Sequence, residues 1–167
     1  MTVSAEVIES LKIDLALEHG AILQYVVHGT QLRDAAITDP VRKIAREEMW
    51  HFEWLAEAIR DRGGEPTLDR ADLFLPSSMV DSLREDVATE DKALAHYART
   101  LELLGASDPA LKRLIERIVD DERHHRARFE RLEASATDSA APMRDSHGAS
   151  GPTPAAAIAP TSIAAAK

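Results

Sequence analysis

Cysteine is absent from this chain of 167 residues, and aromatic side chains make up only 4% of it. Without cysteine the chain forms no disulfide, and thiol chemistry and thiolate-bound iron–sulfur or rubredoxin-type sites are excluded. With so few aromatic side chains, the core has to be built mainly from leucine, isoleucine, valine and alanine. That composition favours helices over sheets, so we expect an all-α protein.

The chain also lacks a basic surplus and long apolar runs. Its net charge is −9 and its isoelectric point lies near 5.2, so cations are favoured as partners and nucleic acid is not expected. No apolar run approaches the roughly 18 residues that span a bilayer, and residues 1–10 show no basic region followed by an apolar core. We therefore expect no membrane partner and a cytoplasmic location.

Four long segments have helical periodicity, with apolar residues recurring at alternating three- and four-residue steps. The expected helices cover residues 3–35, 39–62, 77–104 and 108–134. Asp39-Pro40 and Asp108-Pro109 each read as a helix start, with an N-cap followed by a first-turn proline. Gly63 and Gly105 read as the ends of the second and third helices.

The connections between these helices predict a bundle. Short loops join the first helix to the second and the third to the fourth, so each pair is expected to be an antiparallel hairpin. The linker at residues 64–76 reaches about 40 Å when extended, which is enough to leave the second and third helices parallel. We expect a four-helix bundle over residues 1–134 and a disordered tail over 135–167, which is rich in alanine, proline and serine.

Each apolar helix face is interrupted once by an acid, and in two helices a histidine follows three residues later. The four acids are Glu18, Glu48, Glu90 and Glu122, and the two histidines are His51 and His125. Side chains three residues apart share a helix face, so each Glu-x-x-His pair can bind one metal ion. A single such pair is more often a solvated helix face. The agreement of all six residues in type, spacing and position favours a dimetal centre inside the bundle.

Charge balance supports the same interpretation. An isolated buried carboxylate costs several kcal/mol, so four at one level require protons or cations. Two divalent cations balance four carboxylates and leave the imidazoles as neutral ligands. Carboxylate oxygens with one imidazole per metal suit iron or manganese, and they also accept zinc or cobalt.

Several neighbours of these six residues are candidates for supporting roles. Asp86 and Asp121 are predicted to hold the free ring N–H of a ligand histidine, the alternative being ordinary surface acids. Asp121 and His124 form a competing pair that projects off the apolar face, so His124 is expected to be exposed. Tyr25 and Tyr97 each lie seven residues beyond a glutamate of the centre, where they either contact it or pack in the core.

The residues resemble a bacterioferritin of the ferritin-like superfamily from about Ser4 to Glu133. The resemblance rests on Leu17-Glu18 with Gln24-Tyr25, on residues 47–51 (Glu-Glu-Met-Trp-His), on residues 83–90 (Leu-Arg-Glu-Asp-Val-Ala-Thr-Glu) and on residues 121–125 (Asp-Glu-Arg-His-His). It implies that Glu18, Glu48, His51, Glu90, Glu122 and His125 bind two iron ions, with Glu48 and Glu122 bridging them. Ala93 stands where rubrerythrins usually carry an additional glutamate, so that peroxidase branch is less favoured.

The resemblance also implies partners. Bacterioferritins bind haem b between two subunits through one methionine from each, and Met49 occupies that position; a methionine that fills an interface is the alternative. The family's fifth helix, which lines a cage channel, has no counterpart here, so both a homodimer and a 24-subunit cage stay open. The tail contains an apolar patch at Ile158–Ile163 that is either inert or docks the protein into an encapsulin-type shell.

The expected function is therefore that of a ferroxidase, which oxidises Fe(II) with O₂ for iron storage and detoxification. Two alternatives stay open. One is a dimetal oxidase or peroxidase that acts on an organic substrate or on peroxide. The other is non-catalytic: a haem-bridged dimer or a cargo module of a shell.

Overall fold

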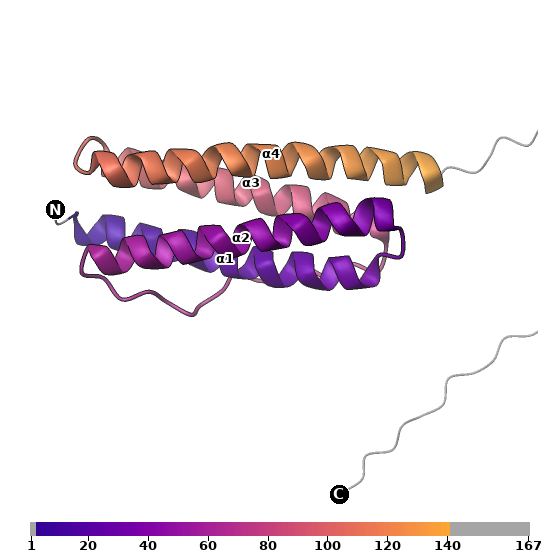
Figure 1. The fold of residues 1–167 in the computed structure, drawn as a ribbon, viewed down its shortest axis with the longest axis horizontal. Helices are drawn as coiled ribbons and strands as arrows, with labels where there is room; N and C mark the ends of the chain where they lie inside the picture. The colour runs from indigo at the N-terminus through magenta and orange to yellow at the C-terminus, as the bar shows by residue number, and fades with distance from the viewer. Residues whose placement is uncertain (1–2, 141–167) are drawn as a thin grey trace, which may run out of the picture.

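The computed structural model describes residues 3–140 and shows four helices, with no strand in that range (Figure 1). They are α1 (Ala5–Gln31), α2 (Ala35–Asp61), α3 (Met79–Leu104) and α4 (Pro109–Ala140). The predicted all-α class is confirmed. Within the described residues, no helix combines the length and the apolar character needed to cross a membrane.

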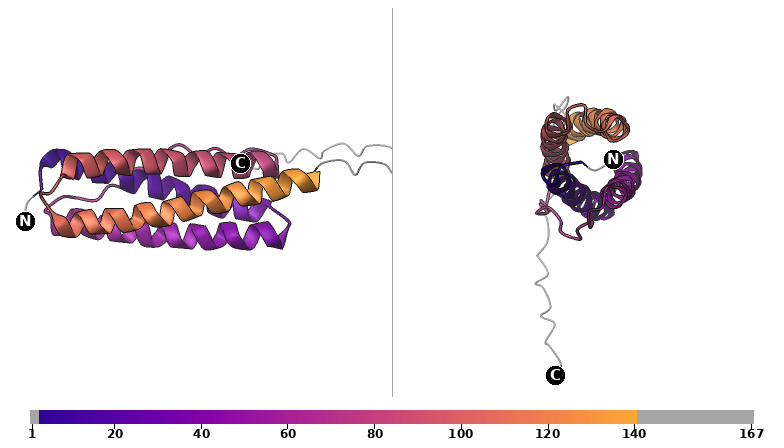
Figure 2. Two further views of the ribbon diagram at one scale, coloured as in Figure 1. Left: turned by 90° about the horizontal axis from the view of Figure 1, so that it is seen from above. Right: turned by 90° about the vertical axis from the view of Figure 1, so that its left-hand side faces the viewer.

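The path of the chain matches the predicted topology. α1 and α2 form one antiparallel hairpin, and α3 and α4 form the other (Figure 1). The segment between α2 and α3 runs back along the bundle, so these two helices point in the same direction. α1 packs against α2 and α3, and α4 packs mainly against α3, whereas α2 and α4 are only loosely in contact. Seen end-on, the helices form a C whose open side lies between α4 and α2 (Figure 2).

The predicted start of the second helix at Asp39-Pro40 is wrong. α2 begins at Ala35, because Asp34 is its N-cap and its side chain accepts from the backbone N–H of Ala36. The earlier start buries Ile37, which is only 4% exposed. Pro40 consequently lies inside the helix, where it has no N–H to donate. The first helix ends correspondingly earlier than expected, at Gln31.

The fourth helix is longer than predicted, since α4 continues past residue 134 to Ala140. Leu132 and Ala136 are buried in the same apolar cluster as Ile37 and Val41 of α2. The first turns of α2 and the last turns of α4 thus contribute to the same apolar cluster. The disordered tail was predicted from residue 135, so it is wrong over residues 135–140, which belong to α4. The rest of that tail and the docking patch predicted at Ile158–Ile163 fall on residues 141–167, outside the described residues.

The core is divided into two apolar clusters. One contains Leu11, Leu15, Leu55, Ile59, Leu111, Ile115 and Ile118, and the other contains Ala21, Ile44, Leu83, Phe129 and Leu132, with further members in each. On α1, Leu15 belongs to the first cluster and Ala21 to the second, and Glu18 is buried between them. The bundle thus has a buried polar layer with an apolar cluster on either side of it along the bundle axis.

Candidate dimetal centre

The structure brings all six predicted ligand residues into this polar layer. Their exposed fractions are 2% for Glu18, 0% for Glu48, 1% for His51, 2% for Glu90, 1% for Glu122 and 5% for His125. Each of the four helices contributes one glutamate, and α2 and α4 add the histidines. Among the described residues, Glu48, His51, Glu122 and His125 form a group whose ligand atoms lie within 4.8 Å of one another.

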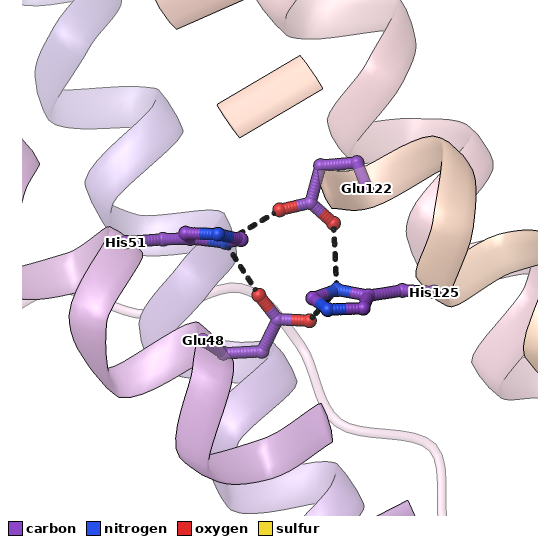
Figure 3. A group of neighbouring side chains, drawn as sticks. All are labelled: Glu48, His51, Glu122 and His125. Atoms are coloured by element: carbon purple, nitrogen blue, oxygen red, sulfur yellow. Dashed lines mark ion pairs between the residues drawn. The ribbon is translucent and has the colours of Figure 1, made fainter. Parts of the chain in front are cut away.

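Glu48 and Glu122 lie between the two histidines in the arrangement of bridging carboxylates (Figure 3). Glu48 places one oxygen 2.8 Å from Nδ1 of His51 and the other 2.9 Å from Nδ1 of His125. Glu122 places its Oε1 2.8 Å from Nδ1 of His51 and its Oε2 3.7 Å from Nδ1 of His125. Each carboxylate therefore offers one oxygen to each of two neighbouring positions.

These close contacts lack hydrogen-bond geometry. Both carboxylate oxygens of Glu48, Oε1 of Glu122 and Nδ1 of both His51 and His125 are buried without a hydrogen-bond partner. Buried polar atoms are normally hydrogen-bonded, and leaving one unpaired costs about 1–3 kcal/mol. Carboxylate oxygens and ring nitrogens that face one another without hydrogen bonds can donate their lone pairs to metal ions. The residues present therefore fit a dimetal centre.

Two tyrosines reach across the bundle to the remaining glutamates. The hydroxyl of Tyr25 donates to Glu90 over 2.7 Å, and the hydroxyl of Tyr97 donates to Glu18. Glu18 also lies 3.8 Å from Nδ1 of His51, so it adds a carboxylate on that histidine's side of the centre. Both tyrosines are fully buried, so they are core residues and contacts of the centre at once.

The outer ring nitrogen of each histidine faces an acid from the opposite helix. Nε2 of His51 is 3.5 Å from Oδ2 of Asp121 on α4, and Nε2 of His125 is 3.2 Å from Oε2 of Glu47 on α2. Such contacts fix which ring nitrogen is free to bind a metal. Asp121 lies near the outer nitrogen of His51 but forms no hydrogen bond with it, whereas Glu47, which the prediction missed, forms one with His125. The sequence repeat contained a signal for it, because an acid directly precedes Glu48 in α2 and Glu122 in α4.

Asp86 does not hold a ligand histidine, contrary to the prediction. It lies buried beside His28, whose Nδ1 is 2.7 Å from Oδ1 of Asp86, and Gln24 donates to the same oxygen over 3.1 Å. His28 and Gln24 in turn contact the backbone of Phe74 in the α2–α3 segment. Asp86 therefore anchors the crossover segment to α1, a role that depends on where that segment passes.

Burial and mutual repulsion govern protonation in the layer. Burial, followed by the negative charges of Glu122 and Glu48, raises the pKa of Glu18 well above its usual value, and burial with Glu122 does the same to the pKa of Glu90. Burial alone lowers the pKa of a histidine. For His51 and His125, contacts with Glu122 and Glu48 outweigh burial and raise the pKa to about 11 and about 10. Protons and metal ions thus compete for the same donors.

Met49 and His124 lie outside the layer. Met49 is 54% exposed, as expected for a side chain one residue past Glu48 and turned away from the centre, and Trp50 beside it is equally exposed. His124 is exposed, as predicted.

Comparison with known proteins identifies the family. Residues 8–134 match the ferritin-like domain. A bacterioferritin from Desulfovibrio desulfuricans is 32% identical over 133 residues, which span 77% of this chain and 74% of that protein. A solved structure of the D. desulfuricans bacterioferritin, described with its diiron site in different catalytic states, aligns with a TM-score of 0.74 at 27% identity over 89% of this chain and 95% of its own.

Two further relatives are informative. The Rhodobacter capsulatus bacterioferritin, solved with a metal-free dinuclear site and haem iron, aligns with a TM-score of 0.76 at 27% identity over 87% of this chain and all of its own. A 3-demethoxyubiquinol 3-hydroxylase from Paracidovorax citrulli is 29% identical over 130 residues, which cover 72% of this chain and 62% of that enzyme. Together with the buried Glu and His cluster, these matches place the chain in the ferritin-like family as a homologue of the bacterioferritins.

Proposed function

We propose that the centre is a ferroxidase site that binds two Fe(II) ions and passes their electrons to O₂, for iron storage and detoxification. The observation that carries the proposal is the pair of buried carboxylates, Glu48 and Glu122, each aimed at both histidines without hydrogen-bond geometry. Each Fe(II) ion gives up one electron when it is oxidised to Fe(III), so two ions supply the two electrons of a two-electron reduction of O₂. The diiron site named for the D. desulfuricans bacterioferritin supports iron over manganese, zinc or cobalt.

The chain's own residues position the substrate iron and exclude water. Glu18 with His51, and Glu90 with His125, are the end ligands in this proposal, while Glu48 and Glu122 bridge. Tyr25 and Tyr97 hold the two end carboxylates in place through their hydroxyl groups. The apolar clusters on both sides exclude water along the bundle axis and strengthen the interactions of charged groups, while the groove at His51 and His125 leaves one side of the layer accessible.

Anaerobic titration tests the proposal directly. Stripped protein is titrated with Fe(II), the bound ions are counted, and a pulse of O₂ is followed by the rise of ferric absorbance. We expect saturation near two irons per chain and a fast oxidation phase that is lost in Glu48→Ala and Glu122→Ala. Glu57→Ala, an exposed acid of the same helix as Glu48, is the matched control. Equal oxidation rates in all four proteins would show that the site assignment is wrong.

An organic substrate is the second candidate, favoured by a groove that leads to the centre. A groove of about 310 Å³ is lined by Trp50, Trp54 and Arg117 and reaches both His51 and His125. The relative named as a hydroxylase acts on an organic molecule, which fits this alternative. Steady oxygen consumption that depends on an added aromatic substrate, in the absence of excess Fe(II), would favour it over the ferroxidase.

Haem binding and assembly are separate proposals. Met49 is exposed on α2, where the methionine of a second subunit can meet it across a haem, as the haem iron of the R. capsulatus protein suggests. Loss of a haem Soret band in Met49→Leu would support this, and an unchanged band would exclude Met49 as the axial ligand. Light scattering distinguishes a dimer from a 24-subunit cage.

A further inference from the structure

A second groove, lined by residues of α2 and α4, lies next to the centre. These two helices flank the open side of the bundle in Figure 2. It has a volume of about 660 Å³. Its lining includes Lys43, Arg46, Arg128 and Arg131, with Glu47 and His125 next to the metal centre. The groove is thus lined by four cationic side chains and only two carboxylates, Asp39 and Glu47, although the net charge of the chain is −9.

The acids of the groove do not neutralise its arginines. Glu47 is already engaged, since it accepts from Lys43 over 2.8 Å and lies 3.2 Å from Nε2 of His125. Across the part of the chain that the structure describes, Arg46, Arg128 and Arg131 form no ion pair, whereas Arg126 on α4 pairs with two acids. Like charges that line one concave surface repel one another, and a bound anion removes that repulsion.

We propose that this groove binds an oxyanion of the phosphate class. Arginine suits such a ligand because its planar guanidinium donates two parallel hydrogen bonds to phosphate oxygens. Arg46 comes from α2 while Arg128 and Arg131 come from α4, so the ligand is held from both walls. The proposed phosphate site contains no metal ion, so its test does not depend on the outcome of the ferroxidase test.

Two sources supply this chemistry: free inorganic phosphate, or an organic molecule that carries a phosphate group. The groove is continuous with the neighbouring one through Lys43, Glu47, His124 and His125, and that second groove contains Trp50 and Trp54. A phosphate with an aromatic substituent can therefore place its charge among the arginines and its ring on a tryptophan. Inorganic phosphate and phenyl phosphate distinguish the two sources.

Binding is measured by calorimetry on the full chain at constant ionic strength, with inorganic phosphate and then with phenyl phosphate. Tryptophan fluorescence locates the event, because both tryptophans of the chain line the adjoining groove. The double variant Arg46→Gln/Arg128→Gln should bind phosphate at least about tenfold more weakly, and Arg131→Gln alone should weaken it several-fold. Tighter binding of phenyl phosphate indicates an organic ligand, and equal binding indicates free phosphate.

The matched control is Arg99→Gln/Arg113→Gln, which removes the same charge at exposed positions outside the groove. It should keep phosphate affinity within about twofold of the unmodified protein, as expected for screened charges at a distance. Wild-type affinity in Arg46→Gln/Arg128→Gln and in Arg131→Gln would overturn the proposal. So would an equal loss in the control pair, because that would reveal a general charge effect.

Discussion

Replacing Glu48 with glutamine should remove most of the stabilisation that divalent metal gives the protein. The side chain is fully buried, and its two oxygens lie 2.8 and 2.9 Å from Nδ1 of the two histidines. Glutamine keeps the volume but removes the charge and replaces one of the two carboxylate oxygens with an amide nitrogen. In the metal-free state Glu48 faces His51 and His125, whose pKa values its charge helps to raise, so Glu48→Gln should itself lower the stability of the metal-free protein. The effect of metal is therefore the difference between loaded and chelated samples of the same variant.

The magnitude follows from binding linkage. At a metal concentration about 100 times the dissociation constant, binding adds about 2.7 kcal/mol to the free energy of unfolding. For a domain of this size that corresponds to a rise in Tm of about 8 °C. Losing even an outer contact of a metal ligand weakens binding about 10- to 100-fold, so losing the bridge should weaken it at least 100-fold. The same metal concentration then adds only about 0.4 kcal/mol, a rise of about 1 °C.

The assay is calorimetric unfolding of chelated and Mn(II)-loaded samples, since Mn(II) avoids oxidation during heating. Glu57→Gln, on the exposed face of the same helix, is the matched control and should keep the full increment. If Mn(II) raises the Tm of Glu48→Gln as much as that of the unmodified protein, Glu48 does not contribute to metal binding and its assignment as a ligand is wrong.

Three further predictions follow from particular contacts. The free energy of unfolding of the metal-free protein should fall as pH rises from about 6.5 towards 10. His51 and His125, whose pKa values are raised to about 11 and about 10, hold protons in the folded state that they release in the unfolded state. A Tm that rises with pH in the presence of chelator would contradict this. Asp34→Ala should lower the free energy of unfolding measured in urea by about 1 kcal/mol, since Asp34 caps α2, whereas Asp39→Ala should have little effect because α2 starts at Ala35. Glu47→Gln should weaken Mn(II) binding about 10- to 100-fold by releasing Nε2 of His125, while Glu53→Gln, exposed on the same helix, should not.

The helical periods determined much of this protein without any coordinates. They predicted four helices, the ends of α3 near Ser78 and Gly105, and the parallel course of α2 and α3 across a long linker. They also predicted that one acid on each helix faces inward. This worked because a residue's place on a helix face follows from the local repeat of 3.6 residues per turn, which the chain carries in its own sequence.

What the tertiary structure decided depends on how the helices are rotated and aligned against one another. The crossed contacts of Glu47 with His125 and of Tyr25 with Glu90, and the pairing of Asp86 with His28, join residues 58 to 78 positions apart. The early start of α2 and the length of α4 were also missed by the local pattern, and both bring residues, Ile37 and Ala136, into one buried apolar cluster. A local repeat shows which side of a helix is apolar, but the distance between two helices arises only when their side chains pack.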